Sequence, residues 1–252
     1  MPESLDQHIN NLCDIARRAG DAIMAIAAPT VLRKADQSPV TTADTAANDL
    51  IVTALTNLTP HIPVISEEGA KDLDEPDQPF WLVDPLDGTK ELIAGNGEFT
   101  VNIALIEQRK PILGVIYAPA VKRLFFSSGT EKTFQQFGNA APRRITARTV
   151  TSGSIVALAS RSHLDERTHE FLRQSDVNEI QQMGSSLKLC LIAAGEADIY
   201  PRFGPTMEWD TAAGHAILNA AGGSLTTIDG QPLRYAKPEL RNPSFVARGG
   251  VR

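Results

Sequence analysis

The order in which apolar patterns follow one another constrains the fold of this chain more than any other feature of its sequence. Apolar residues recur at helical spacing over residues 5–27, before Pro29, and again between Thr42 and Pro60. Five shorter apolar runs follow, at residues 62–65, 80–83, 99–106, 112–117 and 123–127. The first two patterns are typical of amphipathic helices, and the short runs are typical of buried strands.

From about residue 150 the pattern changes to an alternation of strands and helices. We expect strands over residues 155–159, 197–200, 224–228 and 245–248, and helices over residues 165–174, 186–194 and 211–221. Each helix and sheet carries an apolar face that another element must cover, so this order predicts an α/β (α+β) fold with sheets layered between helices. A cluster of Thr, Ser and Gly near residues 148–153 predicts a boundary between an N-terminal lobe, 1–150, and a C-terminal lobe, 151–252.

Charge and composition narrow the classes of partner. The chain has 252 residues with a net charge of −6 and no basic run, so a nucleic-acid polymer is not an expected partner. The polar start argues against a secretory signal, and no run of about 20 apolar residues predicts a transmembrane helix. Cys13 and Cys190 lie in apolar surroundings and predict buried thiols in a cytoplasmic protein. A small phosphorylated ligand is compatible with this charge if cations, Lys or Arg supply local positive charge.

The segment Asp84-Pro85-Leu86-Asp87-Gly88-Thr89 directly follows the apolar run at residues 80–83. The run delivers Asp84 to a strand end, where sheet proteins place ligands, and the Pro and Gly turn the backbone so that Asp87 faces the same point. Close carboxylates repel each other, and Mg²⁺, which prefers oxygen ligands, relieves that repulsion. The turn also frees the Leu86 carbonyl as a ligand, and Thr89 puts a hydroxyl at a helix start, a position suited to phosphate. An acidic turn that caps backbone amides is the alternative.

Three further acids lie at the ends of predicted elements. Glu67, in Ser66-Glu67-Glu68-Gly69, follows a short apolar run, and Asp210 precedes an Ala-rich helix, where we expect it at the N-cap. Asp44 lies in the first turn of the second helix, where the helix dipole favours an acid. Each acid has a simpler interpretation, as a solvated loop residue or a helix cap. The sequence alone does not show that they converge on one or two metal ions.

Positively charged side chains follow predicted strands in the second lobe. Lys188 lies three residues after Ser185, Arg202 follows the strand at residues 197–200, and Arg161 and His163 follow the strand at residues 155–159. These residues are candidates for binding an anion. The alternative is that they are solvated surface residues.

Together these motifs resemble the inositol monophosphatase superfamily. The resemblance rests on residues 84–89, on Glu67-Glu68 upstream and on Trp209-Asp210-Thr211-Ala212-Ala213 downstream, and it covers nearly the whole chain. It implies a layered α-β-α-β-α sandwich. Within the superfamily, residues 81–91, 96–104, 184–188 and 200–206 are similar to the bacterial 3'(2'),5'-bisphosphate nucleotidases of sulfur assimilation.

The resemblance implies a role for each matching position. Two Mg²⁺ ions are expected, with a third and weaker one near Asp44, and Asp44 and Thr89 would position the attacking water. The N-terminal lobe would carry most metal ligands, and the C-terminal lobe would carry substrate contacts and one metal-ligand Asp. The implied catalytic residues are Asp44, Glu67 and Thr89. The implied metal ligands are Glu67, Asp84, the Leu86 carbonyl, Asp87 and Asp210. The implied substrate-binding residues are Glu67, Leu86, Asp87, Gly88, Thr89, His163, Ser185, Lys188, Arg202 and Asp210.

The implied activity is Mg²⁺-dependent, lithium-sensitive hydrolysis of the 3'-phosphate of adenosine 3',5'-bisphosphate, which gives AMP and phosphate. One alternative is an inositol-1-phosphate or fructose-1,6-bisphosphate phosphatase of the same superfamily. A second is a phosphatase of the haloacid dehalogenase type, whose motif separates its two acids by one residue, whereas two separate Asp84 from Asp87. A third is a non-enzymatic nucleotide-binding module. We expect a small nucleotide as partner and a cytoplasmic location; the choice between monomer and homodimer, and peripheral association with the inner face of the membrane, stay open.

Overall fold

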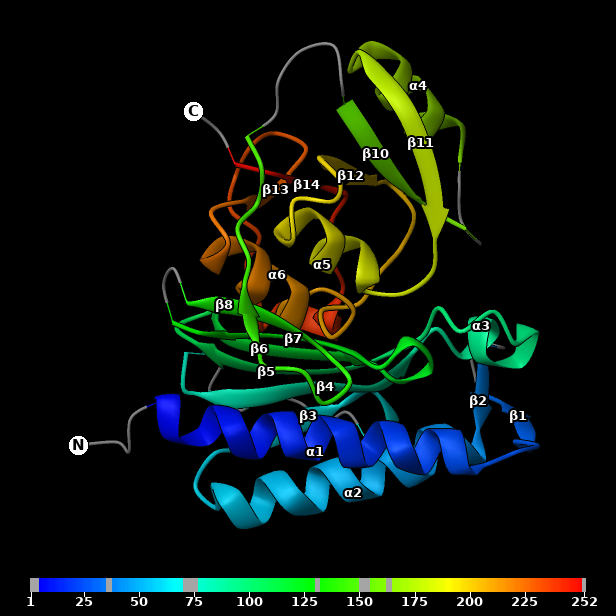
Figure 1. Ribbon diagram of the computed structural model, residues 1–252, viewed down its shortest axis with the longest axis vertical. Helices are drawn as coiled ribbons and strands as arrows, with labels where there is room; N and C mark the ends of the chain where they lie inside the picture. The colour runs from blue at the N-terminus through cyan, green and yellow to red at the C-terminus, as the bar shows by residue number, and fades with distance from the viewer. Residues whose placement is uncertain are drawn as a thin grey trace.

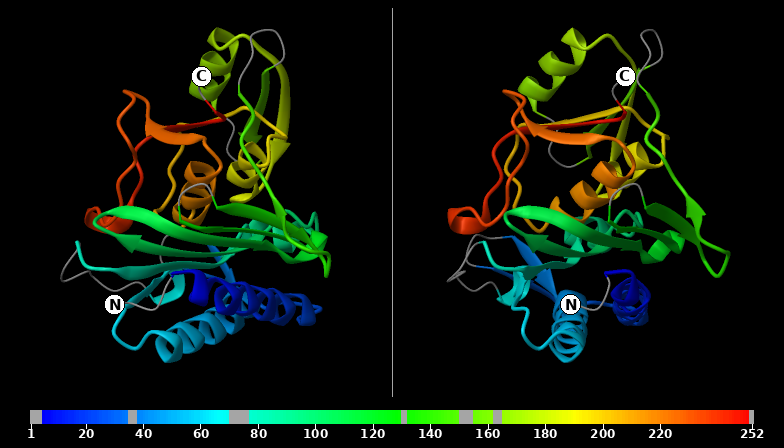
Figure 2. Two further views of the ribbon diagram at one scale, coloured as in Figure 1. Left: turned by 60° about the vertical axis from the view of Figure 1, so that its left-hand side comes forward. Right: turned by 90° about the vertical axis from the view of Figure 1, so that its left-hand side faces the viewer.

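The computed structural model describes residues 5–34, 38–69, 77–129, 132–149, 155–161 and 165–250. Its elements stack in layers (Figure 1). The helices α1 (Leu5–Ala25) and α2 (Thr42–Leu58) form the first layer, a seven-stranded sheet the second, α5 (Leu187–Ala193) and α6 (Ala212–Ala220) the third, a five-stranded sheet the fourth, and α4 (Glu166–Gln174) the last. Figure 2 shows the same order from two further directions. The predicted α-β-α-β-α sandwich is therefore confirmed.

Both sheets are mixed. The seven-stranded sheet has the order β3 (Val64–Ser66), β4 (Phe80–Asp87), β5 (Thr100–Glu107), β6 (Lys110–Ala118), β7 (Arg123–Ser128), β8 (Thr133–Phe137) and β9 (Arg143–Arg144). The five-stranded sheet has the order β11 (Val177–Met183), β10 (Ile155–Ser160), β12 (Ile199–Arg202), β14 (Phe245–Arg248) and β13 (Ser224–Thr227). A small hairpin, β1 (Val31–Arg33) and β2 (Pro39–Thr41), joins the first two helices, and α3 (Thr89–Ala94) follows β4.

Strand β4 is buried on both faces, as its continuous apolar run predicts. Alternate side chains of a strand point to opposite faces. Trp81 and Val83 pack against α1 and α2, whereas Phe80 and Leu82 belong to the core on the α5 and α6 side. The indole N–H of Trp81 donates to Thr59 Oγ1 at 2.8 Å, which satisfies its one polar atom. This double coverage fixes the strand that carries the acidic motif.

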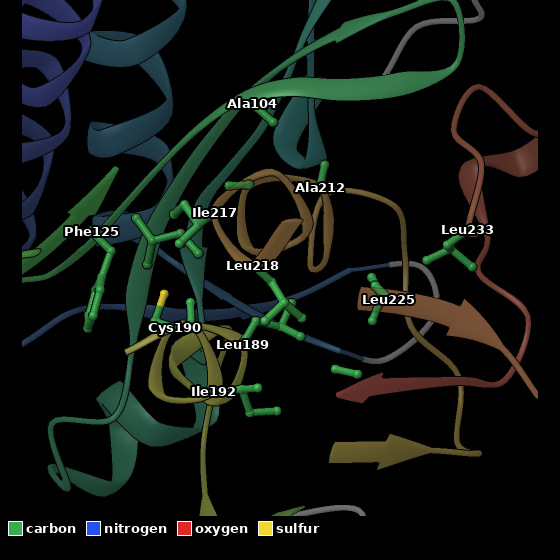
Figure 3. Packing of buried hydrophobic residues seen from close by; sticks show 14 of the residues in the cluster. Ala104, Phe125, Leu189, Cys190, Ile192, Ala212, Ile217, Leu218, Leu225 and Leu233 are labelled. Atoms are coloured by element: carbon green, nitrogen blue, oxygen red, sulfur yellow. The ribbon is translucent and has the colours of Figure 1, made fainter. Parts of the chain in front are cut away.

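Helices from the second half of the chain pack on the sheet of the first half. Figure 3 shows Ile217 of α6 and Cys190 of α5 beside Phe125 of the large sheet. A Cβ on Gly114 of β6 would come within 2.3 Å of the Ala213 carbonyl oxygen, so glycine allows α6 to approach the sheet closely. The two predicted lobes thus share one core. Their boundary falls largely on residues 150–154, outside the described residues, so the division stays a prediction.

Other expectations also have an outcome. Cys13 and Cys190 are free and buried, as predicted. Strands β8, β9 and β11 were not expected. Most side chains of β11 are exposed at the sheet edge, so its sequence lacks the apolar alternation on which strand prediction depends. No helix in the described part of the chain is long and apolar enough to cross a membrane.

Candidate active site

A cavity of about 300 Å³ opens where the large sheet, the middle helices and the end of β12 meet. Nearly all of the predicted site residues line it, although they come from five separate segments of the chain. These residues are Glu67, Asp84, Leu86, Asp87, Gly88, Thr89, Ser185, Lys188, Arg202 and Asp210. Asp44 lies behind Thr89, and His163 lies outside the described residues.

The acidic motif forms the last part of β4 rather than a turn after it. The strand continues to Asp87, and its register with β5 shifts between Asp84 and Asp87. The expectation that Pro85 ends the strand is wrong. The strand continues through Pro85 because a bulge-like shift in the pairing of β4 with β5 accommodates this residue. Gly88 then adopts a positive φ of 101°, which glycine tolerates, and α3 begins at Thr89.

Asp44 is held rigidly at the start of α2. Its Oδ2 atom accepts from the backbone N–H of Thr41 and from the Thr41 hydroxyl, both at 2.7 Å, within a capping box. Its Oδ1 atom accepts from the Thr89 hydroxyl at 2.9 Å. The predicted first-turn position is confirmed, and the capping box directs the second oxygen towards the cavity wall.

Glu67 follows β3 in a single 3₁₀ turn, Glu67–Gly69. Lys34 reaches this turn from the β1–β2 hairpin and donates to Glu67 at 2.7 Å and to Glu68 at 2.6 Å. Burial lowers the pKa of Lys34, but the two carboxylates outweigh that effect and raise it overall. No local sequence pattern predicts this contact, because the partners are more than thirty residues apart.

Asp210 does not cap α6. Thr211 occupies the N-cap, and Asp210 Oδ2 instead accepts from the backbone N–H of Met207 at 2.8 Å. The predicted N-cap was therefore off by one residue, because a tight turn before the helix uses the carboxylate first. As a result, Asp210 faces the cavity with the β4 acids.

The acids of the cavity repel one another. Burial raises the pKa of Asp84 well above its ordinary value, and the charges of Glu67, Asp87 and Asp210 raise it further. The pKa of Asp210 is also raised well above its ordinary value, by burial and then by Asp87. Burial raises the pKa of Asp87 too, while a hydrogen bond from Ser186 and the charge of Lys188 lower it. Such a cluster is stable only with protons or cations among the carboxylates.

Two cations line the other side of the cavity. Lys188 is buried, and its ammonium donates to the carbonyls of Ser185 at 2.6 Å and Met183 at 3.1 Å. Burial lowers its pKa to about 8, against the opposing charge of Asp87. Arg202 is 7% exposed and donates to the Pro205 carbonyl at 3.1 Å, and its Nε has no hydrogen-bond partner among the described residues. A buried guanidinium with an unused donor is suited to an anion.

The charges of the cavity fit a divalent metal. Five carboxylates and three cationic side chains line it, so its own charge would repel a phosphate. Carboxylate and carbonyl oxygens are the donors that Mg²⁺ prefers, and Mg²⁺ keeps several water ligands. In the part of the chain that the structure describes, however, no group of three or more His, Cys, Asp or Glu side chains is arranged so that it could hold a metal ion. Lys34 and Ser186 instead hold oxygens of Glu67 and Asp87.

Comparison with known proteins gives consistent matches. The sequence profile described as "Inositol monophosphatase family" matches residues 4–248. The 3'(2'),5'-bisphosphate nucleotidase CysQ of Salmonella typhimurium (strain LT2) is 48% identical over 94% of this chain and 98% of its own length. The crystal structure of CysQ from Bacteroides thetaiotaomicron, a bacterial member of the inositol monophosphatase family, superposes with a TM-score of 0.81 at 41% identity, over 95% of this chain and 96% of that one. An inositol monophosphatase/NADP phosphatase solved with Mg²⁺ and phosphate has a TM-score of 0.83 over 97% of this chain and 91% of its own; at 19% identity, that likeness concerns the fold alone.

Proposed function

Because the chain belongs to the inositol monophosphatase family, we propose that it is a Mg²⁺-dependent phosphomonoester hydrolase that removes the 3'-phosphate of adenosine 3',5'-bisphosphate. One observation supports a substrate with two phosphates: a single cavity joins an acidic side, formed by the β4 motif, to a cationic side, formed by Lys188 and Arg202. Such a substrate matches both sides, since one phosphate would meet the metal site and the other the two cations. The similar CysQ proteins, named 3'(2'),5'-bisphosphate nucleotidases, favour a nucleotide over a sugar bisphosphate.

Glu67, Asp84, Asp87, Asp210 and the Leu86 carbonyl would hold the metal ions. Their raised carboxyl pKa values support this assignment, because a bound cation replaces the proton or lysine that the cluster otherwise requires. When bound, Mg²⁺ would neutralise charge on the scissile phosphate and make water a stronger nucleophile at neutral pH. The expectation of two ions, with a third near Asp44, is part of this proposal.

Thr89 and Asp44 would orient the attacking water. Asp44 is fixed through Oδ2 by the capping box, so its Oδ1 accepts the Thr89 hydroxyl proton. An attacking water in the cavity would donate to a lone pair of the Thr89 oxygen. As that proton moves to Thr89, the Thr89 hydroxyl proton would pass to Asp44 Oδ1, which becomes neutral. The backbone of Gly88 and Thr89 would bind the scissile phosphate, whereas the Thr89 hydroxyl, which the resemblance also assigns to the phosphate, already donates its one proton to Asp44.

Ser185, Lys188 and Arg202 would hold the second phosphate. The Lys188 ammonium is buried and the Arg202 guanidinium has an unused donor, so an anion placed between them gains two charge-assisted contacts. The assignment of His163 to the substrate stays a prediction, since the residue lies outside the described part of the chain.

The test is phosphate release from adenosine 3',5'-bisphosphate, inositol-1-phosphate and fructose-1,6-bisphosphate, each with Mg²⁺ and with EDTA. We expect kcat/KM to be highest for the nucleotide and activity to disappear with EDTA. Preference for the inositol or sugar phosphate would contradict the substrate assignment but not the metal chemistry. Activity that survives EDTA would contradict the metal assignment.

A further inference from the structure

Ser186 connects the two halves of the candidate metal site. Its hydroxyl lies 2.5 Å from Asp87 Oδ2, which comes from β4, and 2.9 Å from the carbonyl oxygen of Asp210, which comes from the turn before α6. The side chain is 4% exposed. Two of the proposed metal ligands, 123 residues apart, therefore meet at one hydroxyl.

This hydroxyl is not used for the role that its position suggests. Ser186 is the N-cap residue of α5, and serine at an N-cap commonly accepts from a backbone N–H of the first turn. Here no such bond forms, and the side chain points to the acids instead. The preceding residue, Ser185, has a φ of 47°, a conformation that costs energy for a residue other than glycine. The surrounding structure therefore holds this loop in place.

Asn102 of β5 orients the hydroxyl. Its side-chain N–H donates to Ser186 Oγ at 2.7 Å, so the single Ser186 proton is directed away from Asn102 and is shared between Asp87 Oδ2 and the Asp210 carbonyl oxygen. The side-chain amide oxygen of Asn102, Oδ1, is buried and has no hydrogen-bond partner among the described residues. An unpaired buried oxygen destabilises the fold, and the hydrogen bond from Asn102 to Ser186 gives a reason for an asparagine at this position.

We propose that Ser186 is a positioning residue for the metal site: its hydroxyl proton, oriented by Asn102, is shared between the Asp87 carboxylate and the main-chain carbonyl oxygen of Asp210, and so holds the two segments together. Held through Oδ2, Asp87 presents Oδ1 in one orientation. The hydroxyl also sets the spacing between a ligand of the first half and a ligand of the second. This proposal rests on the proposed function, because it assumes that these acids bind a divalent cation.

The test measures metal binding without substrate. We expect Ser186→Ala to bind Mn²⁺, followed by electron paramagnetic resonance or calorimetry, about 10–100-fold more weakly than the unmodified protein, as for other residues that orient metal ligands. Ser127→Ala is the matched control, since Ser127 is a buried serine on β7. Among the described residues, its hydroxyl oxygen accepts only from the backbone N–H of Gly114, at 3.2 Å. The control should bind Mn²⁺ normally. In turnover, Ser186→Ala should raise the Mg²⁺ concentration needed for half-maximal rate more than it lowers kcat at saturating Mg²⁺.

A double-mutant cycle tests the role of Asn102. We expect Asn102→Ala alone to weaken Mn²⁺ binding by less than Ser186→Ala does. Because Asn102 acts through Ser186, adding Asn102→Ala to Ser186→Ala should change binding no further. Additive losses would contradict the relay, and the Asn102 variant also tests the proposal should Ser186→Ala fail to fold.

The outcomes separate the two proposals. Normal Mn²⁺ binding by the unmodified protein together with unchanged binding by Ser186→Ala overturns the role of Ser186 and leaves the proposed function standing. Absence of Mn²⁺ binding by the unmodified protein overturns the proposed metal chemistry, and the positioning role with it. An equal loss in Ser127→Ala would show that the effect is one of general stability, which also overturns the positioning role.

Discussion

Two acids, the buried Glu208 and the half-buried Asp210, lie two residues apart before α6, and they have opposite surroundings. Glu208 is 0% exposed, and its carboxylate accepts from the N–H groups of Ala236 at 2.7 Å and Lys237 at 2.9 Å and from the Lys237 ammonium at 2.6 Å. Asp210 faces the charges of Asp87 and Glu67, which add to the effect of burial on its pKa. Glu208 has the partners that a buried charge needs, whereas Asp210 lies among like charges. The first arrangement stabilises a fold, and the second stores repulsion that a cation can release.

Two lysines repeat the contrast. Lys237 is paired with Glu208 and closes the loop around residues 234–242. Lys188 is buried and donates to backbone carbonyls, with no ion pair within 4.0 Å to a described carboxylate. Burial therefore dominates, and its pKa falls to about 8. Lys188 and Asp210 thus line the cavity without an ion pair to a described residue, whereas Lys237 and Glu208, which pair with each other, do not line it.

The largest effect is expected for Asp87→Asn. The change removes a carboxylate from the metal site, so kcat should fall by roughly three orders of magnitude, since charge stabilisation by the metal supplies much of the catalysis. Near-normal turnover would contradict the metal assignment. Thermal unfolding in EDTA should show a Tm at or above that of the unmodified protein, because the variant removes like-charge repulsion around Asp84.

Glu208→Gln, unlike Asp87→Asn, should lower the stability of the fold. It leaves the Lys237 ammonium without its carboxylate, and breaking such a pair costs about 3–5 kcal/mol, with the low end expected here because the Lys237 side chain is 25% exposed. Chemical denaturation measures the loss. Glu239→Gln, at an exposed acid nearby, should change stability by less than about 0.5 kcal/mol. If Asp210→Asn destabilises the metal-free protein as much as Glu208→Gln, the contrast between the two acids is wrong.

Lys188→Met should raise KM for adenosine 3',5'-bisphosphate by about 10–100-fold, the usual loss for a charge-assisted contact. Lys237→Met is the matched control: it should lower stability without a comparable change in KM. Because the pKa of Lys188 is about 8, the lysine is charged below that pH and loses its charge above it. KM of the unmodified enzyme should therefore rise as pH increases through about 8. If KM of the Lys188→Met variant rises in the same way with pH, a group other than Lys188 causes the pH dependence.

The smallest effect is a pH-dependent difference in Tm between the protein in EDTA and in Mg²⁺. In the folded, metal-free protein the pKa values of Asp84 and Asp210 are raised above the unfolded value of about 4, so above that pH the folded state holds more protons than the unfolded state. As pH rises, Tm in EDTA should therefore fall relative to Tm in Mg²⁺, by about 2–4 °C for each kcal/mol of stability lost. Taking the difference cancels His215, whose burial lowers its pKa to about 3 in both conditions. A difference that shrinks as pH rises would contradict the predicted sign.

Local patterns predicted much of the fold and the acidic half of the site. Continuous burial of β4, the amphipathic α1 and the first-turn position of Asp44 are all encoded within a few residues, so the sequence alone indicates them. The edge strand β11 was missed because it is polar and its partner β10 determines its conformation. The predicted N-cap at Asp210 is off by one residue, because the Asp210 carboxylate accepts from the backbone N–H of Met207 before the helix begins.

The sequence by itself determined the layered fold, the kind of chemistry at residues 84–89 and the family to which the chain belongs. Only the tertiary structure decided which charges are balanced. Lys34 reaches Glu67, Lys237 reaches Glu208, and Ser186 joins Asp87 to Asp210, all across separations that no local pattern records. The physical reason is that the energy of a buried charge depends on the groups within a few ångströms, and folding alone sets which groups those are.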